Sequence, residues 1–189
     1  MCIRDRFGKK TSGSFGVARA ARNATLQETY GFYLFNRLDN YDFLGNPEIA
    51  PESSWNVNLS ADFKGEKFGI SGGVFGYFFQ DYIAGIKRDD YSAMTIGASG
   101  VKQYENLDHA SIVGGEVKVR YSIAKNIVFT SNNSVSYGTD DEGKALPLIP
   151  PFKSINSIKY SWKQILFDVT YITGAMQNHV DFDKYGELP

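Results

Sequence analysis

Apolar and polar residues alternate without interruption in one stretch of the chain, Ser54–Phe63, which reads SWNVNLSADF. Successive side chains of a β-strand point to opposite faces, so Trp55, Val57 and Leu59 share one face of a predicted strand and the asparagines between them share the other. About ten residues are also enough for a tilted strand to cross the hydrocarbon core of a bilayer. The pattern therefore predicts a strand that separates water from an apolar medium, either a protein core or lipid.

The same alternation recurs along the chain. Seven strands are predicted, at residues 14–19, 54–63, 68–83, 110–121, 127–137, 153–162 and 165–173. In the fourth of them, Glu116, Lys118 and Arg120 share one face, and burying these charges in a dry core would cost several kcal/mol unless each were paired. The pattern favours a sheet with lipid on one side and a water-filled interior on the other.

The connections between these strands alternate in length. Long segments at residues 20–52, 84–107 and 138–151 are separated by short turns at 64–67, 122–126 and 163–164. Compact soluble domains rarely contain such long connections, whereas outer-membrane barrels have short turns at one end and long loops at the other. Aromatic residues suited to the interfacial girdles of a barrel fall near predicted strand ends: Tyr77, Tyr82, Tyr104, Tyr121, Tyr137, Tyr160 and Trp162.

Composition narrows the function classes. The formal net charge is −1 and there is no basic run, which disfavours a nucleic-acid partner. No segment approaches the ~20 consecutive apolar residues of a membrane helix. Cys2 is the only cysteine, and His109 and His179 have no second ligand at metal-binding spacing, so we expect neither a disulfide framework nor a metal site.

The N-terminus departs from the strand pattern. It has no apolar segment followed by a cleavage site, so the protein is either not exported or a piece of something longer. The segment Met1–Arg6 fits no strand, and we expect residues 1–12 to be a spurious or disordered end.

Residues 45–56 read GNPEIAPESSWN. This segment resembles the N-P-x-L-x-P-E-x-S-x-N signature of TonB-dependent outer-membrane receptors, with Ile49 in place of the usual leucine. The motif residues are Asn46, Pro47, Pro51 and Glu52. Segments at residues 18–30, 74–83, 104–116 and 146–152 resemble further elements of the family in the same order, and this order makes the resemblance specific.

The resemblance implies an all-β fold, an antiparallel transmembrane β-barrel of 22 strands to which this chain contributes about seven or eight. Residues 1–189 would be one partial barrel domain, without the plug domain and the segment that contacts TonB. It implies a receptor in the outer membrane of a Gram-negative bacterium that takes up a scarce nutrient, most favourably a ferric siderophore or other metal chelate, with energy from the TonB complex. No catalysis and no cofactor are expected.

An aromatic-rich segment at residues 30–43 is the best candidate for ligand contact. Aromatic faces beside an arginine suit a flat, anionic chelate through stacking and charge. The candidate residues are Tyr30, Tyr33, Phe35, Arg37 and Tyr41. The alternative is that these aromatic side chains only pack the loop.

Three other functions remain open at this point. A small structural or adhesive outer-membrane barrel would need an even number of strands and a closing pair. A soluble β-sandwich binding module would bury the apolar face against a second sheet. An outer-membrane hydrolase would use Ser71 of the G-x-S-x-G segment 69–73 with His109, but no helix follows that serine, as a nucleophile elbow requires. The ligand also remains open among siderophore, haem, cobalamin, copper chelate and glycan.

Overall fold

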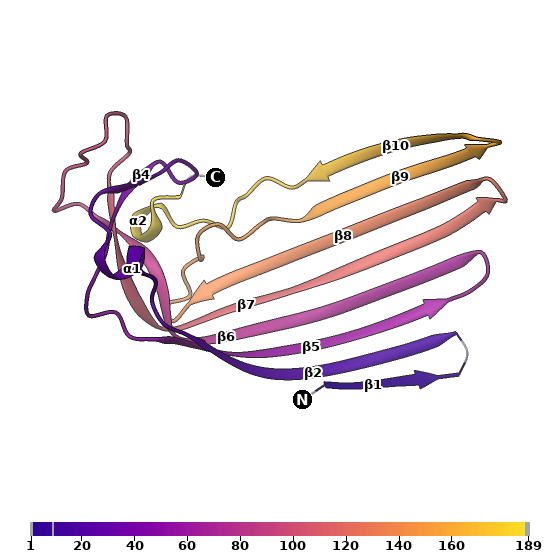
Figure 1. Cartoon of the computed structure of the whole chain (residues 1–189), viewed down its shortest axis with the longest axis horizontal. Coiled ribbons are helices and arrows are strands. Elements are labelled where there is room, and N and C mark those ends of the chain that lie inside the picture. Colours follow the sequence, from indigo (N-terminus) through magenta and orange to yellow (C-terminus); the bar gives the residue numbers. More distant parts are fainter. Residues whose placement is uncertain (1, 9, 188–189) are drawn as a thin grey trace.

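The computed structural model describes residues 2–8 and 10–187, and in them one large antiparallel sheet dominates (Figure 1). Along this sheet the strands follow the order β1, β2, β5, β6, β7, β8, β9, β10, so β2 pairs with β5 past the two short strands between them and every other pair is consecutive in the chain. Their bounds are β1 Cys2–Phe7, β2 Thr11–Arg22, β5 Glu52–Lys64, β6 Phe68–Arg88, β7 Val101–Ala124, β8 Ile127–Asp140, β9 Lys153–Trp162 and β10 Ile165–Gly174.

Smaller elements lie in the connections. Helix α1 (Leu26–Tyr30) and strands β3 (Leu34–Asn36) and β4 (Tyr41–Leu44) lie between β2 and β5, and helix α2 (Phe182–Tyr185) follows β10. Strand β4 pairs with β3 and runs parallel to the start of β7. Within residues 2–8 and 10–187, neither helix is long and apolar enough to cross a bilayer.

The register gathers the apolar side chains of successive strands on one side of the sheet, here called the apolar face. Leu59 of β5 lies opposite Val74 of β6, and Gly115 of β7 and Val135 of β8 continue the same row. Trp55 and Leu59 are 48% and 55% exposed, because no second layer of the described chain covers this face. An apolar surface of this extent argues against a soluble sandwich and indicates contact with lipid.

The opposite face of the sheet, here called the polar face, carries the charges. From β5 to β10 these include Asp62, Lys64, Glu116, Lys118, Arg120, Lys153, Lys159 and Asp168, whereas β1 and β2 carry Asp5 and Arg19 on the apolar face. Lys159 and Asp168 face each other across β9 and β10 with 3.2 Å between Nζ and Oδ2. A charge on a lipid-facing wall costs several kcal/mol, whereas a wet lumen accepts it, so this division orients the sheet as the wall of a barrel.

All seven predicted strands are present, but the predicted boundaries were wrong at the loop end. β6 continues to Arg88 and β7 starts at Val101, so the expected loop at residues 84–107 shrinks to 89–100. Beyond Ile83 both faces of this hairpin meet protein or water, so side-chain alternation fades while the backbone ladder continues. The long connection at residues 20–52 likewise contains α1, β3 and β4.

The expectation that residues 1–12 are disordered fails for the part that is described. Cys2–Phe7 form β1 and pair with β2, with Cys2 opposite Gly16. An edge strand is held by backbone hydrogen bonds and needs no apolar alternation, which explains why the pattern missed it. Met1 and Lys9 lie outside the described residues, and whether this end is native stays a prediction.

The β6–β7 hairpin bends sharply where it leaves the membrane-spanning part of the sheet (Figure 1). Asp81 has a φ of 54°, and the otherwise continuous register between the two strands omits the pair Asp81 and Asp108. Because a left-handed residue cannot stay in a regular ladder, the backbone groups beside it need other partners. The outer half of the hairpin, residues 82–88 and 101–107, therefore bends toward the loops.

A small core fills this outer layer. Its buried members are Ala84, Leu107, Ala110, Leu146 and Tyr185. Tyr185, on α2, is fully buried, and its hydroxyl donates to Asp140 Oδ2 at 2.7 Å at the end of β8. Burial raises the pKa of the Tyr185 hydroxyl, and its bond to Asp140 raises it further. The outer ends of β6, β7 and β8 thus hold the loops as one packed layer.

Candidate functional site

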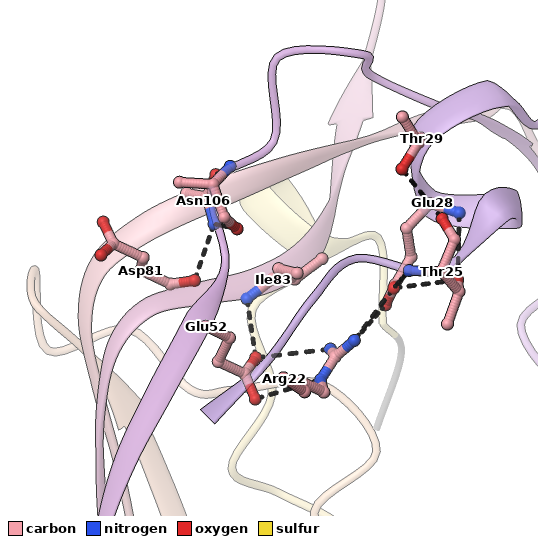
Figure 2. A network of polar contacts seen from close by, with 9 residues as sticks. Arg22, Thr25, Glu28, Thr29, Glu52, Asp81, Ile83 and Asn106 are labelled. Atoms are coloured by element: carbon pink, nitrogen blue, oxygen red, sulfur yellow. Dashed lines mark hydrogen bonds and ion pairs between the residues drawn. The ribbon is translucent and has the colours of Figure 1, made fainter. Parts of the chain in front are cut away.

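Glu52, the glutamate of the sequence motif, is the centre of a polar network at the outer rim of the sheet (Figure 2). Its side chain is nearly buried, at the first position of β5. Oε2 accepts the backbone N–H of Ile83 at 3.0 Å, and Oε1 accepts Nε of Arg22 at 3.3 Å. Glu52 therefore satisfies a buried amide that lies beyond the last β5–β6 pair, Ser53 opposite Gln80, and it ties the end of β2 to β6.

Asn106 completes the support of the bend from β7 (Figure 2). Its Nδ2 donates to the carbonyl oxygens of Asp81, at 2.7 Å, and Ala50, at 3.1 Å, while its Oδ1 accepts the Ala50 N–H at 2.8 Å. One amide side chain thus binds both the bend and the segment that precedes β5. The motif glutamate and this asparagine act together as a structural clamp on the rim.

Helix α1 is attached to the same network. Thr25 and Glu28 form a capping box, in which each side chain accepts the other residue's backbone N–H. Arg22 reaches Glu28 Oε2 with Nη1 at 2.9 Å, so one guanidinium joins Glu28 to Glu52. Burial raises the pKa of Glu28, but hydrogen bonds from Arg22 and Thr25 outweigh it and leave that pKa below its ordinary value. The short helix is therefore fixed at both its cap and its acidic side chain.

The remaining motif residues shape the turn between α1 and β5. The Asn46 N–H donates to the Glu28 carbonyl at 2.9 Å, and its Oδ1 accepts the Glu48 N–H at 3.0 Å. Pro47 and Pro51 are exposed, and Pro51 directly precedes β5. A proline fixes φ and disfavours a helical residue before it, which suits an extended entry into the strand. These contacts give the motif a structural role.

The aromatic segment 30–43 is held against the loop at residues 89–100 by polar side chains. Asp42 is fully buried, and its Oδ2 accepts the N–H groups of Met94 and Thr95, both at 2.8 Å. The Lys102 ammonium, also buried, lies 2.6 Å from Asp39 Oδ2. These contacts join residues more than fifty positions apart, and the sequence pattern gave no sign of them because Asp39 and Asp42 look like solvated turn residues.

The five predicted ligand-contact residues differ in exposure. Tyr30 is 69% exposed, and Phe35 and Arg37 are also exposed, whereas Tyr33 is half-buried. Tyr41 is 3% exposed, and the Lys102 ammonium lies 4.3 Å from the centre of its ring. Its aromatic face is therefore already occupied by a cation of the protein itself.

Arg37 differs from the other cations of the outer layer. Arg22, Lys102 and Lys184 are each paired with a carboxylate. In the described part of the chain, Arg37 makes no hydrogen bond or ion pair, and its side chain is exposed. An exposed guanidinium without an internal partner is free to bind an anion from outside.

The histidines and the G-x-S-x-G serine do not form a catalytic site. Ser71 lies opposite Lys118 and His109 opposite Gln80, which places the serine and histidine roughly 30 Å apart at 3.3 Å per residue of strand. His179 stacks on the Tyr137 ring with 3.9 Å between ring centres. Within residues 2–8 and 10–187, no group of three or more potential ligands from His, Cys, Asp and Glu is placed to hold a metal ion.

Comparisons with known proteins agree with this architecture. The model of the family "TonB dependent receptor-like, beta-barrel" matches residues 7–187. The heme/hemopexin utilization protein C of Haemophilus influenzae strain 86-028NP is 28% identical over 118 residues, which cover 59% of this chain and 17% of that protein.

Two solved structures show the same fold. The copper transporter OprC superposes with a TM-score of 0.79 at 21% identity, over 97% of this chain and 27% of that one. The siderophore receptor PirA from Pseudomonas aeruginosa superposes with a TM-score of 0.70 at 16% identity, over 89% and 32%. This chain thus spans a third or less of the length of each of these proteins. The family model matches almost all of the chain, and the structure shows a lipid-facing wall with a charged interior. The chain therefore belongs to the TonB-dependent receptor β-barrel family, whose members lie in the outer membrane of Gram-negative bacteria.

Proposed function

We propose that the protein is an outer-membrane receptor that imports a metal chelate, most favourably a ferric siderophore, with energy supplied through the TonB complex. The observation that carries this proposal is the division of the membrane-spanning part of β5 to β8 into an uncharged lipid-facing side and a charged lumen side beneath a packed loop layer. Such a wall encloses a water-filled path and presents its loops to the outside. In this proposal the protein carries out no covalent chemistry.

The ligand class is inferred from the loop residues and the relatives together. The relatives are named for the use of heme/hemopexin, the transport of copper and the reception of siderophores, all of which concern metals. On this chain the exposed Arg37 supplies positive charge, and the exposed rings of Tyr30 and Phe35 supply aromatic surface. A guanidinium beside aromatic rings suits a flat, anionic chelate. Tyr41 is left out of the proposed contact surface because it is buried.

Growth tests the importer assignment directly. A Gram-negative strain that lacks the gene is grown under iron limitation with ferric hydroxamate, ferric catecholate or haem as the sole iron source, with and without the complete gene product. We expect one of these sources to restore growth only when the gene product and TonB are both present. The same comparison is made under copper limitation with a copper chelate as the sole copper source. Equal growth with and without the gene on every iron source and on the copper source would contradict the proposal.

Two variants separate ligand contact from loop structure. Replacing Arg37 by alanine removes an exposed, unpaired charge, so uptake is expected to fall while the receptor still inserts. Replacing Tyr41 by phenylalanine keeps the ring beneath Lys102 and is the matched control, for which uptake stays near wild type. If the Arg37 variant transports normally at limiting ligand concentration, this residue has no part in binding.

A further inference from the structure

A group of hydrogen-bonding side chains lies on the apolar face in the middle of β8 and near the loop end of β9. Ser131 and Asn133 of β8 lie opposite Asn156 and Ser154 of β9, which makes a compact group of four, here called the polar patch. Along β8 it is bracketed on the same face by Phe129 on the side of the short turn and by Val135 on the side of the loops. On β8 the polar patch therefore lies within the lipid-facing band, and on β9 it reaches the loop end of the strand.

The polar patch satisfies only part of its own hydrogen-bonding capacity. Asn133 Nδ2 donates to Ser131 Oγ at 3.0 Å, and Asn156 Nδ2 donates to Ser154 Oγ at 2.9 Å. Among the described residues, neither asparagine side-chain oxygen accepts a hydrogen bond, and each amide nitrogen has a second N–H to donate. Acyl chains offer neither donors nor acceptors, and an unsatisfied polar group in hydrocarbon costs several kcal/mol.

We propose that the polar patch is the contact by which two copies of this barrel associate side by side in the membrane. It is uncharged, and it offers free amide oxygens and free N–H groups in equal number, so a second polar patch supplies the missing partners for both. Two barrels inserted in the same direction and related by a two-fold axis bring the same residues together at the same depth. Val117 and Val119 flank the polar patch on β7 and Thr173 flanks it on β10, and these short side chains let a second wall come close beside the exposed ring of Tyr171.

Site-directed disulfide formation tests this contact in the membrane. In the complete gene product, freed of Cys2 and any other cysteine, Asn156→Cys is compared with Leu59→Cys, which lies on the same face of β5, away from the patch. After oxidation of outer membranes, we expect the first variant to shift to twice the monomer mass and the second to stay at the monomer mass. A shift of Asn156→Cys to any other mass would identify a different protein partner and overturn the proposal, as would no shift at all.

A second variant removes the attraction without unfolding the wall. Leucine is at home in a lipid-facing position, so Asn133→Leu combined with Asn156→Leu should insert normally and remain folded in detergent. The wild-type receptor, extracted in mild detergent, is expected to have the mass of a dimer by native mass spectrometry, and the double variant the mass of a monomer. A monomeric wild type, or a double variant that is still dimeric, would refute self-association through this patch.

Discussion

Replacing Glu52 by alanine should lower the free energy of local opening at one backbone amide of the rim, that of Ile83. The substitution removes the acceptor of the Ile83 N–H, 3.0 Å away, at a residue that is 6% exposed. A buried donor without a partner costs about 1–3 kcal/mol. The lost contacts with Arg22 add at most about 1 kcal/mol, because that side chain is 43% exposed and still pairs with Glu28.

Hydrogen exchange of the receptor in detergent measures this effect. A loss of about 1–3 kcal/mol in the free energy of local opening speeds the exchange of the Ile83 amide by roughly 5- to 150-fold. Peptides from the periplasmic half of β6 should exchange as in the wild type, because they lie outside the clamp.

Glutamine at position 52 is the matched control. Its side-chain oxygen still accepts the Ile83 N–H, while the charge that pairs with Arg22 is gone. Exchange at Ile83 should therefore stay near wild type in this variant. If the alanine variant exchanges like the wild type, or the glutamine variant like the alanine variant, the bond from Ile83 is not what holds the rim.

The remaining predictions concern the turn, the orientation of the wall and pH. Gly45→Ala should expose the segment after α1 to added protease, because a Cβ there would lie 2.6–2.7 Å from backbone atoms of three residues. Leu59→Lys should lower the free energy of unfolding in bilayers by about 2–4 kcal/mol, whereas Asn58→Lys, on the lumen side, should change it little; equal losses would invert the assigned faces. Glu28 and Asp181 have lowered pKa values, Asp181 chiefly because its carboxylate accepts the Lys184 N–H. The stability that these carboxylates give is present above their ordinary pKa values and is lost as pH falls through the lowered ones, so the protection of amides in α1 and α2, measured against the intrinsic exchange rate at each pH, should fall in acid and stay high at neutral pH.

The wall of the barrel could be predicted from the sequence because its side-chain pattern is local. Alternation along Ser54–Phe63 assigns each residue to lipid or lumen without knowledge of any partner strand, and the register then places Leu59 beside Val74 on the predicted side. The motif at residues 45–56 located Glu52 but did not reveal what its side chain does. That carboxylate accepts the N–H of Ile83, a residue beyond the end of the β5–β6 ladder, and no local pattern predicts this contact.

The sequence by itself thus determined the strands, the two faces of the sheet and the family resemblance, since charges avoid hydrocarbon whatever the rest of the molecule does. Only the tertiary structure decided how the loops are built. The Lys102 ammonium lies against the ring of Tyr41, and Asp42 accepts the backbone N–H groups of Met94 and Thr95. Both contacts join segments more than fifty residues apart. Such contacts depend on how the β6–β7 hairpin bends over the rim, and a left-handed residue such as Asp81 adopts that conformation only when the surrounding side chains support it.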